Sequence, residues 1–138
     1  MTLDDLKAAF ALADDWEERY AIIIDLGRKL AGLPAQEQVE ANIVKGCMSQ
    51  VWMVAEVDAQ GQFQVRADSD ALIVRGLIGV LLLIVADKTA AEVARLDMAA
   101  EMDALDLARH VSVNRRNGLS AMVLRIRQLA AAAAASGE

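Results

Sequence analysis

The sequence predicts an α+β fold in which several helices pack against a small antiparallel sheet of three strands. Apolar residues recur with helical spacing at both ends of the chain, whereas a stretch near the middle alternates with a period of two. The length of 138 residues and the hydrophobic fraction of 56% suit one core. We therefore expect a single domain over residues 1–138.

Two amphipathic helices are predicted at the start. Thr2 and Asp5 have the spacing of a capping box, and helical periodicity follows to about Asp14. Asp14 is placed to cap a second helix, whose apolar face runs from Trp16 to Leu30 before a glycine and a proline end it.

The middle of the chain predicts a β-hairpin. Residues 49–57 and 62–68 both alternate between apolar and polar positions, and the turn between them carries Gly61 where a positive φ is needed. Ile43 and Val44 are expected to add the third short strand.

Helices are predicted again in the second half. Residues 68–70 offer capping oxygens to an apolar helix over residues 71–86, which reads as a core helix. Capping residues at Thr89 and Asp97 begin two shorter helices, and a final helix follows with Ser112 or Asn114 as its cap.

Composition and charge exclude several classes of partner. The net charge of −6, from 20 acidic and 14 basic residues, and the lack of a basic stripe argue against a nucleic-acid partner. The apolar run of residues 71–86 is interrupted by Arg75 and is too short for a membrane span. The first residues are acidic where a secretory signal is basic, so we expect a cytoplasmic protein in a reducing compartment.

Cys47 is the single cysteine and the main candidate for chemistry. One thiol forms no internal disulfide and makes no tetrahedral metal site by itself, so its chemistry needs another molecule. Gly46 allows a turn beside it, and Lys45 places a cation near a group that reacts as thiolate. The alternative is that Cys47 acts as a small buried hydrophobe.

His110 is the single histidine, so a Cys47/His110 dyad is the alternative enzymatic interpretation, as a cysteine-dependent transferase or hydrolase. The sequence has no phosphate-binding glycine loop, paired-histidine metal motif or serine elbow.

Two arginine positions pose a choice between binding and structure. Arg115 and Arg116 fall in the first turn of the last helix, where they add to positive potential and favour an anion site, or else they bend into solvent. Arg75 stands within apolar sequence, where it is either buried and paired or extended to the rim of a site.

Several segments together resemble the SufE family, sulfur acceptors that work with cysteine desulfurases in iron–sulfur cluster assembly. The resemblance is carried by residues 16–20, 24–30, 46–52 (GCMSQVW), 68–77 and 114–122. One departure is Met48, where the family often has glutamine.

The resemblance implies a fold like that of SufE and the related IscU scaffold proteins. It implies that Cys47 takes sulfane sulfur from a cysteine desulfurase of the SufS or CsdA type as a persulfide, stimulates that enzyme and passes sulfur to an Fe–S scaffold complex or another acceptor. The chain would then be an accessory protein and not an enzyme itself. It would hold no metal or cofactor, although the desulfurase uses pyridoxal phosphate, and a homodimer is an open option. Arg115 would lie near the cysteine and stabilise anionic sulfur. Contacts to the partner would come from Gly46, Met48, Ser49, Gln50, Asp70 and Arg75.

Overall fold

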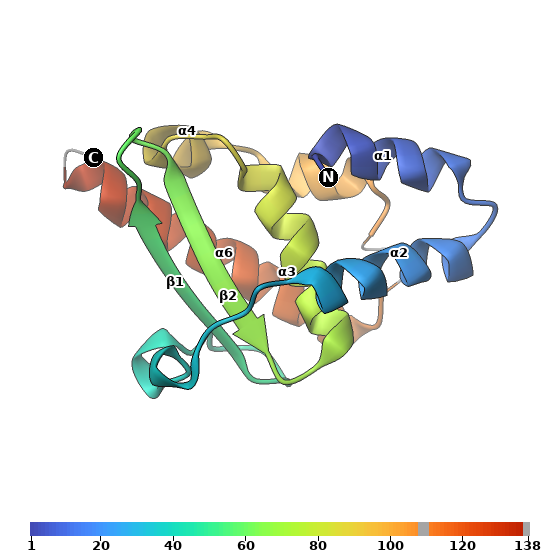
Figure 1. Cartoon of the computed structure of the whole chain (residues 1–138), viewed down its shortest axis with the longest axis horizontal. Coiled ribbons are helices and arrows are strands. Elements are labelled where there is room, and N and C mark those ends of the chain that lie inside the picture. The colour runs from blue at the N-terminus through green and yellow to red at the C-terminus, as the bar shows by residue number, and fades with distance from the viewer. Residues whose placement is uncertain (108–110, 137–138) are drawn as a thin grey trace.

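The computed structural model describes residues 1–107 and 111–136, and it has a mixed α+β architecture. Figure 1 shows the β-hairpin with α6 behind it, α3 in the middle, and α1 and α2 on the far side of α3. The elements in order are α1 (Leu3–Leu12), α2 (Trp16–Lys29), the 3₁₀ turns η1 (Ala35–Glu37) and η2 (Glu40–Asn42), β1 (Val51–Val57), β2 (Phe63–Ser69), α3 (Leu72–Val85), α4 (Ala90–Arg95), α5 (Met98–Ala104) and α6 (Val113–Ala135).

The predicted hairpin is confirmed. β1 and β2 pair antiparallel, with Val51 opposite Ser69 and Val57 opposite Phe63. Gly61 closes the turn with a φ of 81°, a left-handed conformation that glycine adopts without steric cost.

The predicted third strand is wrong, since the sheet of the described residues has two strands. Ile43 makes one isolated bridge to Trp52, and the Val44 amide donates to the Val51 carbonyl at 2.8 Å. The chain leaves η2 just before this contact and turns at Gly46 just after it, so too few residues remain extended for a ladder.

Most predicted helix starts are confirmed, with one shift. Thr2 and Thr89 both form complete capping boxes. The cap of α2 is Asp15 and not Asp14, because the Asp15 carboxylate accepts from the Glu18 amide at 3.0 Å. Asp14 lies one residue earlier, where its amide donates to the Glu18 side chain.

The apolar stretch after β2 forms the buried helix α3, as predicted. The expected capping by residues 68–70 is wrong. The N-cap residue of α3 is Ala71, and no side chain makes a capping hydrogen bond there. The Asp68 carboxylate instead accepts from the Leu33 and Ser69 amides at 3.0 and 2.8 Å, so it is already occupied. Within the described residues no helix is both long and apolar enough to cross a bilayer.

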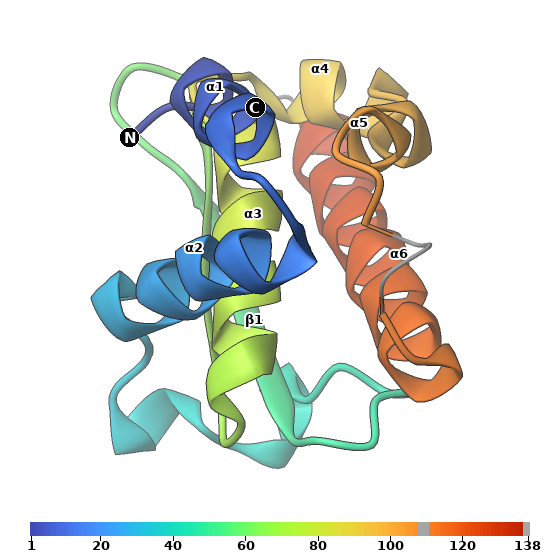
Figure 2. The same ribbon diagram turned by 90° about the vertical axis from the view of Figure 1, so that its right-hand side faces the viewer.

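α2 crosses α3 with the two backbones in direct contact, and Figure 2 shows this crossing from the side. A Cβ added at Gly76 would lie 2.2 Å from the Ile23 carbonyl oxygen, and one added at Gly27 would lie 2.7 Å from the Leu72 oxygen. The crossing therefore requires glycine at both positions, and it fixes where the first half of α3 lies.

Candidate functional site

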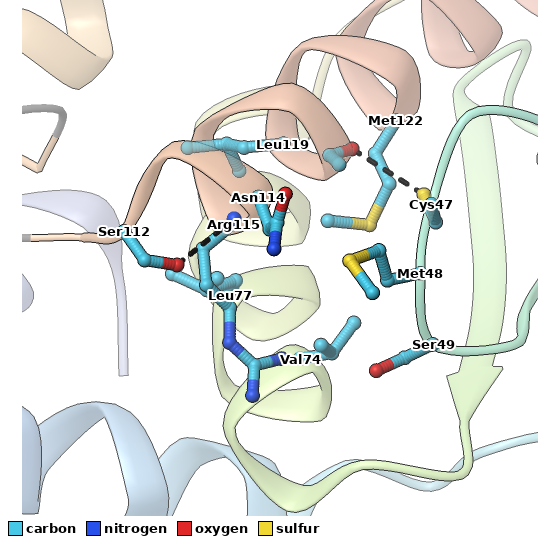
Figure 3. Close-up of a pocket in the computed structure, with 11 residues that line it drawn as sticks. Cys47, Met48, Ser49, Val74, Leu77, Ser112, Asn114, Arg115, Leu119 and Met122 are labelled. Carbon is cyan, nitrogen blue, oxygen red and sulfur yellow. Dashed lines mark hydrogen bonds between the residues drawn. The ribbon is translucent and has the colours of Figure 1, made fainter.

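Cys47 lies on the loop that leads into β1, and this loop reaches the first turns of α6 (Figure 3). Gly46 has a φ of 94°, so the chain reverses immediately before the cysteine. The thiol then faces α6 and donates to the Gly118 carbonyl, with an S···O distance of 3.5 Å. The Cys47 side chain thus connects the loop to α6.

A pocket of about 420 Å³ opens beside the thiol. Its wall comes from three segments that are distant in the sequence: the cysteine loop, α3 and α6. The lining residues are Cys47, Met48, Ser49, Val74, Leu77, Ser112, Asn114, Arg115, Gly118, Leu119 and Met122. Just over half of these residues have apolar or sulfur-containing side chains, and the polar side chains are those of Ser49 on the loop and of Ser112, Asn114 and Arg115 at the N-terminal end of α6.

The surroundings of Cys47 favour the protonated thiol. Burial raises the pKa of the Cys47 thiol, because a thiolate loses hydration there. The Gly118 oxygen accepts from S–H and repels a thiolate. The resting thiol is therefore a poor nucleophile, since only the thiolate reacts.

Arg115 lines the same pocket as Cys47 but does not touch the sulfur in this arrangement. The Ser112 hydroxyl caps α6 by accepting from the Arg115 amide at 3.2 Å, so Ser112 is the cap and not Asn114. Figure 3 shows the Arg115 side chain running toward Val74, away from the thiol. Within the described residues its guanidinium forms no ion pair, so it is a free cation at the pocket.

Asp70 anchors the end of the cysteine loop. Its Oδ1 accepts from the Gln50 amide at 3.0 Å, and its own amide donates to the Gln50 carbonyl at 3.3 Å. Both residues are exposed. Asp70 and Gln50 therefore act on the loop that carries Cys47, although neither lines the pocket.

Arg75 is paired but only partly buried, so the structure agrees with the paired alternative and not with full burial. Its guanidinium forms an ion pair with Asp68 and donates to the Gly27 and Leu30 carbonyls at 3.1 and 2.7 Å. These carbonyls belong to the C-terminal end of α2, where a cation is favourable. Arg75 does not line the pocket, and its predicted contact with a partner stays a prediction.

Seven further wall residues were not assigned to the site by sequence reasoning: Val74, Leu77, Ser112, Asn114, Gly118, Leu119 and Met122. Arg115, Leu119 and Met122 stand at i, i+4 and i+7 in α6, which is the spacing of one helix face and the signal that points to them. His110 lies outside the described residues, so the Cys47/His110 pairing stays a prediction. Across residues 1–107 and 111–136, no three His, Cys, Asp or Glu side chains are grouped to hold a metal ion.

Two sequence comparisons agree on one family, and a comparison with solved structures agrees on the fold. The family model described as "SufE: Fe-S metabolism associated domain" matches residues 4–130. An uncharacterised SufE-like protein of Rhizobium meliloti strain 1021 is 37% identical over 129 residues, which cover 91% of this chain and 92% of that protein. The solution structure of a hypothetical protein from Thermus thermophilus has the same fold, with a TM-score of 0.77 and 20% identity over 98% of this chain and 99% of that one.

Proposed function

The chain belongs to the SufE family, whose domain is associated with Fe–S metabolism, and from this premise we propose that Cys47 is a sulfur acceptor. It takes sulfane sulfur from a cysteine desulfurase, stimulates that enzyme by removing its product, and passes the sulfur on for iron–sulfur cluster assembly. The observation that carries the proposal is the position of the single thiol, at a pocket wall and held there by one weak hydrogen bond.

The transfer step is a thiol–persulfide exchange. The Cys47 sulfur attacks the outer sulfur of the donor persulfide, so a new S–S bond forms on Cys47 while the donor S–S bond breaks. The donor cysteine leaves as thiolate and takes up the proton that Cys47 gives up. A persulfide and a thiol thus exchange places, with no net oxidation or reduction.

The resting geometry supports protection of the sulfur between its two transfers. A persulfide is easily reduced or oxidised in solvent. The half-buried Cys47 side chain faces the pocket wall, and the pocket has room for one additional sulfur atom. Arg115 lines that space, so we propose that its guanidinium stabilises the persulfide anion once the sulfur extends into the pocket.

We further propose that the loop moves for the reaction. Gly46 provides a pivot on one side of Cys47, and the Asp70–Gln50 contact anchors the other side. A partner that binds the open loop better than the closed loop shifts the balance toward the reactive state. We propose that the desulfurase is this partner, with Gly46, Met48, Ser49 and Gln50 in its contact surface.

The test is to incubate the purified chain with a cysteine desulfurase and free cysteine, and then to measure its intact mass. We expect a gain of one sulfur atom, mapped to Cys47 and removed by a reductant. Cys47→Ser should fold normally, gain no sulfur and fail to stimulate the desulfurase, because a hydroxyl is a far weaker nucleophile near neutral pH. Full stimulation by Cys47→Ser would contradict the carrier mechanism. A cysteine-dependent hydrolase would instead lose its activity when His110 is changed, without any gain of sulfur.

A further inference from the structure

The pocket beside Cys47 contains three sulfur atoms from two different parts of the chain. Cys47 and Met48 come from the loop, and Met122 comes from α6. Figure 3 shows the side chains of Met48 and Met122 pointing toward one another in the space beside the Cys47 sulfur. Met122 is 1% exposed, so its thioether is held in place, whereas Met48 is 80% exposed and free to adjust.

We propose that Cys47, Met48 and Met122 together bind one soft monovalent metal ion, Cu(I). Thiolate and thioether sulfur are the ligands that select Cu(I) among biological metals. The sequence analysis expected no metal site, because it considered the single thiol and not the methionine thioethers. The fold supplies the missing donors by bringing α6 against the loop.

The other lining residues exclude harder metals. Among the described residues that line the pocket there is no carboxylate for Mg(II) or Ca(II), and no imidazole or second thiolate for Zn(II). Charge acts in the same direction. A thiolate with Cu(I) is neutral, whereas a thiolate with a divalent ion leaves a positive charge beside the Arg115 guanidinium.

Binding proceeds by exchange of the metal for a proton. The Cys47 S–H bond breaks, the sulfur–copper bond forms, and the proton goes to solvent, while copper stays in the +1 state. The hydrogen bond to Gly118 is lost in the same step, because the bound sulfur has no proton to donate. The two thioethers coordinate as neutral ligands and release nothing.

The experiment is an anaerobic titration of the reduced chain with Cu(I), in competition with bicinchoninate, under ascorbate and without added thiols. We expect one Cu(I) per chain, release of one proton, and protection of Cys47 from iodoacetamide. Cys47→Ser should abolish this binding. Met48→Leu and Met122→Leu should each weaken it by at least about tenfold, the lower end of what even outer-shell changes cost a metal site. Zn(II) should not compete.

The matched control is Met102→Leu, since Met102 lies on α5 and does not line the pocket. It should bind Cu(I) like the wild type. The proposal is overturned if Met48→Leu and Met122→Leu bind as tightly as the wild type, if Met102→Leu weakens binding equally, or if Zn(II) binds as tightly as Cu(I). Met48 is exposed, so Met48→Leu decides the question alone if Met122→Leu does not fold. None of these results depends on whether Cys47 accepts sulfur.

Discussion

The contact between Asp70 and Gln50 leads to a quantitative prediction for the cysteine loop. Asp70→Ala removes the acceptor of the Gln50 amide and leaves the reverse backbone hydrogen bond in place. A hydrogen bond of this kind contributes about 1 kcal/mol net, and loss of about 1 kcal/mol from the closed loop raises the open fraction about fivefold. The free energy of unfolding should fall by no more than about the same 1 kcal/mol, because the closed loop belongs to the native state.

The assay is the rate of Cys47 alkylation by iodoacetamide, followed by intact mass. When the loop opens and closes faster than the reagent reacts, this rate is proportional to the open fraction, so Asp70→Ala should react about fivefold faster. Asp70→Asn keeps an acceptor oxygen and should give a smaller increase. Asp70→Arg should give at least the effect of alanine, since it also lacks the acceptor.

Asp58→Ala is the matched control for Asp70→Ala. Asp58 accepts from the Gln60 and Gln62 amides at 2.9 Å each, but in the hairpin turn, away from the loop. It should leave the alkylation rate unchanged. An unchanged rate in Asp70→Ala, or an equal increase in Asp58→Ala, would refute the idea that Asp70 restrains the loop.

Three further predictions concern charge and burial. The pH profile of Cys47 alkylation should lie at higher pH than that of a free thiol, because burial raises the pKa of the Cys47 thiol. Above the ordinary thiol pKa, the wild type should therefore lose more stability toward urea than Cys47→Ser. Coincident alkylation profiles of Cys47 and a free thiol would contradict this. Arg115→Ala should slow sulfur transfer with little loss of stability, and a wild-type transfer rate would remove Arg115 from the mechanism. Asp68→Ala should lower the free energy of unfolding by about 3 kcal/mol, because it leaves the Arg75 guanidinium without its ion-pair partner. Urea unfolding followed by tryptophan fluorescence measures this loss. A loss below about 1 kcal/mol would mean that the two α2 carbonyls hold Arg75 without the carboxylate.

The parts of the fold that the sequence predicted correctly depend on near neighbours. The capping boxes at Thr2 and Thr89 and the Gly61 turn involve residues close together in the chain, so their patterns are visible in the sequence. The error at the start of α3 arose because a distant segment decides there. Asp68 was expected to cap α3, but it is taken by Leu33 and Arg75, which local sequence does not reveal.

The candidate site divides in the same way. The motif around Cys47 identified the thiol and its loop by resemblance, whereas the common helix face of Arg115, Leu119 and Met122 was a signal in the sequence that the prediction did not use. Nothing in the sequence shows that this face meets the loop, because residues 47 and 118 are joined only by tertiary folding. The Gly118 acceptor and the shared pocket therefore had to come from the structure.

The glycine crossing of α2 and α3 also bears on the precision of the pocket. Gly76 lies between Val74 and Leu77, the two α3 residues of the pocket wall, and it touches the α2 backbone with no side chain between them. Closely packed interiors compress little and transmit strain, so α3 is a rigid support for this wall of the pocket. Any displacement at this crossing therefore also displaces the pocket wall at Val74 and Leu77. A Gly76 variant that still folds would then lose sulfur transfer because the pocket wall at Val74 and Leu77 is displaced, although residue 76 itself contacts α2 and not the loop.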